Sequence, residues 1–305
     1  MKKTIKNIKI WIKAFRLRTL PLSMSSSLVG SFLAYSSDNF SWPVFFLSLT
    51  TILFLQILSN LANDYGDTVN GADNEHRTGP QRVSQKGEVS LRAMRRMIII
   101  FMSLSFVSGT FLIFTGLNQF QTINVIIFFI LGVSAIFAAT KYTIGKNPYG
   151  YQGFGDVFVF IYFGLVGVFG TFYLHAEFID PWIILPATSI GLFSSGVLNL
   201  NNLRDGSSDK LNGKKTIVVR YGVKAAKRYH VIILILGFVA SVIYTIQFFE
   251  SPVQLIFMVT IPFLLKDMKT VMQNRIPLEL NEELRKLSIT TFIFSVTFGL
   301  GLLLS

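Results

Sequence analysis

Apolar stretches about as long as a bilayer is thick recur from one end of this 305-residue chain to the other. A helix needs about 20 apolar residues to cross the hydrocarbon core, whereas the strands of a membrane barrel alternate in polarity, which these stretches do not. We therefore predict an all-α, polytopic membrane helical bundle of about nine transmembrane helices, forming a single domain over residues 1–305. The predicted spans are 19–37, 43–65, 97–117, 121–141, 154–174, 181–203, 230–249, 252–272 and 287–304.

The composition supports a membrane protein and excludes some kinds of chemistry. Only 14% of the residues are charged, compared with about 25% in soluble domains. The chain has no cysteine, which excludes disulfides, thiolate catalysis and zinc–cysteine sites. The basic N-terminal segment, residues 1–18, has no small-residue cleavage site, so we expect no removable signal peptide.

The basic residues predict how the spans are oriented. All 28 Lys and Arg residues precede the first span or follow spans two, four, six and eight. The alternate loops carry only acidic charges, at Asp38, Glu177, Asp180 and Glu250. Basic loops of membrane proteins stay in the cytoplasm. We expect a cell (inner, cytoplasmic) membrane protein with a cytoplasmic N-terminus, long cytoplasmic loops at 66–96 and 204–229, and the C-terminus on the opposite side. This pattern accounts for the net charge of +12, so we expect no nucleic-acid partner.

Two of the cytoplasmic segments carry asparagine and aspartate four residues apart, a spacing that places side chains on one helical face. They are NLANDYGDTVNGAD, residues 60–73, and NLNNLRDGSSDKLNGKK, residues 199–215. The residues concerned are Asn60, Asn63, Asp64, Asp67 and, further on, Asp73 in the first segment, and Asn201, Asp205 and Asp209 in the second. Because the segments end spans two and six, they indicate an internal pseudo-repeat of about four helices.

This residue pattern favours a site for a metal-bound diphosphate. Carboxylate, amide and water oxygens bind Mg²⁺, which proteins usually hold jointly with substrate phosphates. Two facing aspartate sets would hold two or more Mg²⁺ ions around one diphosphate, and nearby cations would stabilise it as a leaving group. The candidate cations are Arg77, Arg82, Arg204, Lys214 and Lys215. One such segment alone is usually solvated surface, but two at the ends of apolar helices favour function.

Three stretches carry a resemblance to a known family. They are NDYGDTVNGAD with RTGPQR, starting at Asn63; NPYGYQGFGDVFVFIYFGLVGVFGTFY, residues 147–173; and NNLRDGSSDKLNGKKTIVVRYG, residues 201–222. The chain resembles the UbiA-type membrane prenyltransferases over nearly its whole length, and among them those acting on 1,4-dihydroxy-2-naphthoate in menaquinone synthesis. The third aspartate of the first stretch is displaced by two residues from the commoner superfamily spacing.

The resemblance implies the UbiA-type fold and a particular reaction. A polyprenyl diphosphate binds through Mg²⁺ and ionises to an allylic cation. The ring of dihydroxynaphthoate attacks this cation and loses its carboxylate as carbon dioxide, giving demethylmenaquinone. The implied metal ligands are Asp67, Asp73, Asp205 and Asp209, with Asn63, Asp64 and Asn201 in support. We expect Asp67, Asp205 and Lys214 to be catalytic, and the lipid bilayer to be the partner that receives the apolar chain.

A glycine-rich segment, residues 141–156, leads into the fifth span. In the family interpretation Asp156 positions the aromatic acceptor or acts as base for its hydroxyl, and Tyr149 contacts the substrate. Tyr151 and Lys141 are weaker candidates. The alternative for Asp156 is a carboxylate at a helix N-terminus, where it interacts favourably with the helix dipole.

Other functions explain part of the pattern. A related aromatic prenyltransferase, such as one acting on hydroxybenzoate, would share the aspartates, but the displaced third aspartate and the 147–173 stretch weigh against it. A secondary transporter of an anionic solute would explain the spans and the repeat, yet transporters place their sites near the midplane. A lipid-binding scaffold would leave the paired aspartates unexplained.

Overall fold

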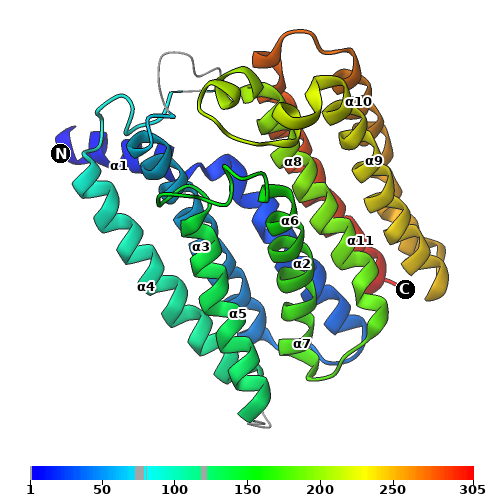
Figure 1. Ribbon diagram of the computed structural model, residues 1–305. Coiled ribbons are helices and arrows are strands. Elements are labelled where there is room, and N and C mark those ends of the chain that lie inside the picture. Colours follow the sequence, from blue (N-terminus) through cyan, green and yellow to red (C-terminus); the bar gives the residue numbers. More distant parts are fainter. Residues whose placement is uncertain (1, 73–78, 80, 118–121) are drawn as a thin grey trace.

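The computed structural model describes residues 2–72, 79, 81–117 and 122–305, with side chains from residue 8 onward. Within these ranges every regular element is a helix. The long helices lie side by side, and the chain starts at one end of the bundle and finishes towards the other (Figure 1). The predicted all-α bundle is confirmed.

Seven helices in the described ranges are long and apolar enough to cross a membrane. Five of them are α3 (Trp42–Val69), α4 (Leu91–Gly116), α5 (Thr122–Lys141), α9 (Ile217–Gln247) and the composite span Gly155–Ala176. The other two are α8 (Ile184–Leu211) after the 3₁₀ turn η3 (Pro181–Ile183), and α11 (Leu280–Leu303) after the turn η5 (Pro277–Glu279).

The remaining two predicted spans are also helical, but they are short or interrupted. Helix α2 (Leu20–Ser36) has 17 residues. The stretch predicted at 252–272 divides into a 3₁₀ helix, η4 (Pro252–Thr260), and α10 (Ile261–Gln273), because Pro262 starts a new α-helix. The predicted "about nine" spans thus correspond to seven continuous helices and these two segments.

The loops are shorter than predicted, because helices continue beyond their apolar parts. The prediction of a loop at 204–229 was wrong for most of its length: α8 runs to Leu211, and α9 begins at Ile217. Likewise, α3 runs to Val69. Hydropathy marks the part of a helix that contacts lipid, whereas backbone hydrogen bonding carries the helix on into the polar interface. The aspartates at 67, 205 and 209 are therefore helical.

Two hydrophobic cores hold the bundle together. The larger is built around α8, which packs against α9, α11 and the fifth span, with Phe193 and Phe294 fully buried. The smaller joins α3 to α4 and includes Leu58, Leu61 and Met94. Members of both cores, such as Val197 and Val83, line the cavity described below.

The fifth span consists of α6 (Gly155–Val159), the π-helix η2 (Phe160–Phe169) and α7 (Gly170–Ala176). Its glycines permit close packing. A Cβ on Gly164 would lie 2.6 Å from the carbonyl oxygen of Ala187 in α8, and one on Gly167 would lie 2.7 Å from Cβ of Ser26 in α2. Small residues let membrane helices approach closely. The fifth span therefore packs closely against α2 and α8, and Tyr162, Phe163 and Val166 of its π-helix line the cavity.

The N-terminal helix α1 (Lys2–Phe15) and the turn η1 (Leu17–Thr19) lie at the basic end of the bundle, which we call the basic face. Arg16 adopts a left-handed conformation, with φ 51°. Nδ2 of Asn60 in α3 donates hydrogen bonds to the carbonyl oxygen of Phe15 (3.0 Å) and to Oγ1 of Thr19 (3.1 Å). These bonds hold the reversal of the chain against α3.

Candidate active site

A cavity of about 720 Å³ extends inward from the basic face. Its polar end is lined by the last turns of α3 and α8 and by the segments that follow them. Its apolar part is lined by α4, α5 and the fifth span. The volume falls within the range of ligand pockets, roughly 300–1,000 Å³.

The carboxylates of α3 are buried and paired. Asp67, only 3% exposed, accepts a hydrogen bond from Nη2 of Arg82 at 2.6 Å. Asp64, 2% exposed, accepts one from Oγ of Ser84 at 2.7 Å. Arg82 also donates to the backbone carbonyl oxygen of Asn63. This arginine thus ties the segment after α3 back onto the helix.

The carboxylates of α8 form a second set. Arg204 holds Asp205 with two hydrogen bonds, from Nε to Oδ1 at 2.9 Å and from Nη2 to Oδ2 at 2.7 Å. The same guanidinium donates to the side-chain oxygens of Asn201 and of Asn281 in α11. Asp209 lies 3.2 Å from the ammonium of Lys214. Because removing one partner of a buried pair leaves an uncompensated charge, each cation here is needed by its carboxylate.

Lys214 brings the two sets together. Its Nζ lies 3.6 Å from Oδ1 of Asp67 as well as 3.2 Å from Oδ1 of Asp209. The side chain of Lys214 is only 17% exposed, so these attractions are weakly screened by solvent. The predicted meeting of the two segments at one site is therefore what the structure shows.

The donor chemistry suits a hard divalent cation. Mg²⁺ binds through one or two carboxylates together with substrate phosphates, and the site offers Asp64, Asp67, Asp205 and Asp209 beside three cations. In the described part of the chain no three acidic or histidine side chains converge closely enough to hold an ion by themselves. The arrangement therefore fits a metal that is bound together with a phosphate ligand.

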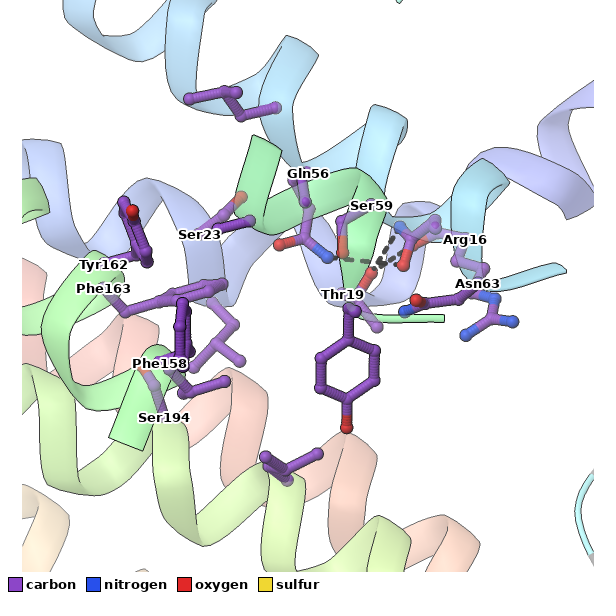
Figure 2. A pocket seen from close by; sticks show the side chains of 18 of the residues that line it. Arg16, Thr19, Ser23, Gln56, Ser59, Asn63, Phe158, Tyr162, Phe163 and Ser194 are labelled. Atoms are coloured by element: carbon purple, nitrogen blue, oxygen red, sulfur yellow. Dashed lines mark hydrogen bonds between the residues drawn. The ribbon is translucent and has the colours of Figure 1, made fainter. Parts of the chain in front are cut away.

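A polar recess opens beside the aspartates, between η1 and α3. Figure 2 shows Arg16, Thr19, Gln56, Ser59 and Asn63 gathered in it, with hydrogen bonds among the drawn side chains. A cation and several neutral donors and acceptors therefore face the cavity, and Asn63, Ser59 and Gln56 lie about one, two and three helical turns before Asp67.

Aromatic rings form the wall across from this recess. Tyr142, Tyr149, Phe158 and Tyr162 follow one another along the cavity, with ring centroids 5.4, 4.0 and 6.1 Å apart. The hydroxyl of Tyr149 donates to the carbonyl oxygen of Ala138 at 2.8 Å, which fixes this ring against α5. Burial raises the pKa of Tyr142 and Tyr149, so both hydroxyls stay protonated. The wall suits a flat aromatic ligand or a delocalised cation.

The far end of the cavity is mainly apolar, and the hydroxyl side chains of Ser48, Thr51 and Thr171 also line it. Leu112 and Ile113 of α4, Phe128 of α5 and Leu174 of α7 line it. They belong to a small cluster that joins α4, α5 and α7. The cavity is thus polar at the basic face and hydrocarbon-like in its depth.

Most of the predicted site residues line this cavity: Asn63, Asp64, Asp67, Arg82, Tyr149, Asn201, Arg204, Asp205, Asp209 and Lys214. Two do not. Lys215 is exposed, with its ammonium 3.3 Å from Oε1 of Gln152. Asp156 lies in the first turn of α6 and accepts a hydrogen bond from Tyr229 of α9 at 3.2 Å. The predicted metal ligand Asp73 and the predicted cation Arg77 lie outside the described residues.

The polar recess could not be recognised from hydropathy and charge, which mark Arg16 and Arg18 only as charges that set orientation. The RLRTLP motif at the start of the first predicted span was a usable signal. Ser59 and Gln56 lie within an apolar span, one and two turns before Asn63 respectively. Polar residues inside a membrane span indicate function.

Comparison with known proteins agrees with this geometry. Residues 23–277 match the model of the UbiA prenyltransferase family. A curated protein of Haemophilus influenzae, 1,4-dihydroxy-2-naphthoate octaprenyltransferase, is 40% identical over 97% of this chain and 96% of its own. The chain belongs to the UbiA prenyltransferase family.

Solved structures of UbiA proteins share the fold. The apo structure of a UbiA homolog from Aeropyrum pernix K1 matches 92% of this chain and 97% of its own, with a TM-score of 0.72 and 16% identity. A UbiA homolog from Archaeoglobus fulgidus bound to DMAPP and Mg²⁺ matches 94% of this chain and 98% of its own, with a TM-score of 0.61 and 14% identity. The expected UbiA-type fold is confirmed, and the protein is a membrane prenyltransferase.

Proposed function

We propose that this protein transfers a polyprenyl group from polyprenyl diphosphate to 1,4-dihydroxy-2-naphthoate, releasing diphosphate and carbon dioxide and forming demethylmenaquinone. The observation that carries the proposal is one cavity with a carboxylate–cation end, a polar recess, an aromatic wall and an apolar depth. The name of the Haemophilus influenzae relative supports the choice of naphthoate among aromatic acceptors.

The diphosphate binds at the basic face between α3 and α8. Asp67, Asp205 and Asp209 would hold Mg²⁺, which would neutralise the charge that develops on the leaving diphosphate; the predicted ligand Asp73 lies outside the described residues. Arg82, Arg204 and Lys214 supply further positive charge at fixed positions. Preorganised charges of this kind are a major source of rate enhancement, because they require no rearrangement as the C1–O bond breaks.

The prenyl chain extends into the apolar depth, and its C1 lies at the level of the aromatic wall. The rings of Tyr149, Phe158 and Tyr162 stabilise the allylic cation by their faces and keep water from it. The acceptor lies against the polar recess, where Arg16 pairs with its carboxylate and Gln56 and Ser59 bind its oxygens.

The ring carbon that bears the carboxylate attacks C1 of the prenyl group. A carbon–carbon bond forms as the prenyl–oxygen bond completes its cleavage. The carboxylate then leaves as carbon dioxide, and its bonding electrons return to the ring. No redox partner is needed. The first product is the quinol, which becomes demethylmenaquinone on later oxidation.

We propose that the basic face is cytoplasmic and that the protein lies in the cell membrane, with its C-terminus on the opposite side. A long apolar substrate explains the membrane location, and the charge segregation supports this orientation. A transporter would need its polar site near the midplane, whereas here the buried charges described above cluster at one face.

Purified protein supplied with Mg²⁺, a polyprenyl diphosphate and a panel of acceptors tests the proposal by mass spectrometry. We expect a prenylated, decarboxylated naphthoquinol from dihydroxynaphthoate and little product from 4-hydroxybenzoate. A preference for hydroxybenzoate would replace the proposed acceptor. Failure to form product at any chain length, with protein that remains monodisperse, would remove the enzyme assignment for this site.

We expect Asp67→Asn and Asp205→Asn each to lower turnover by about a hundredfold or more, because each removes a charge that serves the leaving group, a role worth several kcal/mol. Asp38→Asn is the matched control, since Asp38 is exposed at the far end of the bundle. Yield and size-exclusion profile report folding. Near-normal turnover of either site variant would exclude that residue from the metal role.

A further inference from the structure

A tyrosine from the segment between α5 and α6 reaches the point where the two aspartate sets meet. The hydroxyl of Tyr151 donates a hydrogen bond to Oδ1 of Asp67 at 2.5 Å. The ammonium of Lys214 lies 4.7 Å from the centre of the same ring. One side chain thus contacts a carboxylate of α3 and the lysine that joins Asp67 to Asp209.

The backbone around Tyr151 is fastened to the segment that follows α8. The backbone N–H of Lys215 donates to the carbonyl oxygen of Tyr151 at 2.7 Å. The side chains of Lys215 and Arg220 donate to Gln152. Gly153 has φ +86°, and a Cβ there would lie 2.2 Å from the carbonyl oxygen of Lys215. The tyrosine and the lysine segment are therefore held together as one unit.

The chemistry of this contact is one of orientation. The phenol hydroxyl of Tyr151 is the donor in this contact, because the carboxylate of Asp67 can only accept. A hydrogen bond to a carboxylate is stronger than a neutral one and limits its rotation. A cation over a ring face gains attraction while keeping its N–H groups available to oxygen ligands.

We propose that Tyr151 is a positioning residue of the diphosphate site, orienting Asp67 and holding Lys214 between α3 and α8 so that both aspartate sets act on one metal-bound diphosphate. The inference rests on the proposed function. It adds a third segment, residues 147–154, to the two aspartate segments that the sequence predicts.

Two variants separate the two contacts of Tyr151. Tyr151→Phe removes the hydrogen bond and keeps the ring under Lys214, whereas Tyr151→Leu removes both. Tyr221→Phe is the matched control, because Tyr221 is 70% exposed near the same face and does not line the cavity. The metal probe is Mn²⁺ with inorganic diphosphate, and bound ion is measured by electron paramagnetic resonance without turnover.

We expect Tyr151→Phe to weaken Mn²⁺ binding in the presence of diphosphate roughly tenfold, the effect of losing one charge-assisted hydrogen bond. The Mg²⁺ concentration for half-maximal turnover should rise by a similar factor, while kcat at saturating Mg²⁺ stays within about threefold. Tyr151→Leu should additionally raise KM for polyprenyl diphosphate, because Lys214 loses its support.

Equal Mn²⁺ affinity in Tyr151→Phe and Tyr221→Phe would overturn the inference, and so would a loss of kcat that Mg²⁺ concentration does not change. The binding measurement needs no aromatic acceptor. A wild-type protein inactive on dihydroxynaphthoate, but with Tyr151-dependent binding of Mn²⁺ and diphosphate, would therefore contradict the proposed acceptor and leave the inference supported. An active wild type with unaltered Mn²⁺ binding in the variants would contradict the inference alone.

Discussion

At the scale of single residues, the site is a set of buried charges, each held by a named partner. Asp67 has Arg82 and Tyr151, Asp205 has Arg204, and Asp209 has Lys214. Placing a carboxylate this deep without a partner would cost several kcal/mol, and each cation offsets part of that cost for its aspartate. The same cations can also contact the oxygens of an incoming diphosphate. The negative charges of the aspartates and of the diphosphate are therefore balanced by one shared set of cations.

Gly153 offers a test at this scale, because its neighbour leaves no room for a side chain. We expect Gly153→Ala to lower kcat/KM for polyprenyl diphosphate by roughly tenfold or more, since a Cβ 2.2 Å from the Lys215 carbonyl oxygen must push the two segments apart. The measurement is steady-state kinetics at saturating Mg²⁺.

Gly213→Ala is the control for this variant. Gly213 also has a positive φ, +69°, so alanine there carries a similar backbone strain of about 1–2 kcal/mol. A Cβ on Gly213 would meet nothing within 4 Å. If both variants lose activity equally, backbone strain rather than the close contact is responsible, and the fastening of the 147–154 segment is not essential.

At the scale of elements, the cavity is bounded by α5, which lines it with small residues, and by the fifth span, which lines it with aromatic rings. Helix α5 turns Gly132, Ala135, Ala138 and Ala139 towards the cavity, together with Leu131. Helix α5 packs against α3 and α4. The π-helix η2 turns Tyr162 and Phe163 towards the same space, whereas Phe160 contacts Gly191 of α8.

Enlarging a side chain on this face of α5 should fill the path of the prenyl chain. We expect Ala135→Phe to lower kcat/KM for an eight-unit polyprenyl diphosphate about tenfold more than for geranyl diphosphate, because only the longer chain must pass the new ring. Ile130→Phe, on the exposed side of α5 at 61% exposure, is the control. Equal losses for both substrates would show that Ala135 does not lie along the chain's path.

At the scale of the whole molecule, charge and hydropathy together decide how the bundle sits in the bilayer. The buried carboxylates and their cations lie at one end, and the opposite end contains loops such as the one before Pro252. Segregation of all 28 basic residues to one side gives a strong preference for one insertion topology. A water-soluble acceptor that enters at the basic face and a lipid-dissolved chain from the bilayer can then meet in one cavity.

The topology is directly testable, because the chain contains no native cysteine. We expect a membrane-impermeant maleimide to label Glu250→Cys in intact spheroplasts and to label Lys146→Cys only after the membrane is opened. Both positions are exposed, and they lie on opposite sides of the predicted topology. The reverse labelling pattern would invert the proposed orientation.

The sequence by itself determined the class of fold, the identity of the two aspartate helices and the sidedness of the charges. These properties are local: apolar length, a four-residue helical spacing and the net charge of each loop can all be read without knowing which segments meet. The aspartates at 67, 205 and 209 and the cations Arg82, Arg204 and Lys214 could be predicted as one site for a chemical reason, because two matched aspartate segments suit one metal-bound diphosphate.

Only the tertiary structure decided which other side chains join them. Tyr151 reaches Asp67 across 84 positions of sequence, and a left-handed turn at Arg16, held by Asn60, places Arg16 in the lining of the same cavity as Gln56. Asp156 turns towards Tyr229, and Lys215 towards Gln152. Such choices depend on how helices pack and where chain segments cross. Hydropathy and spacing carry no information on either, because contacts between distant segments are settled by the packing of the whole bundle.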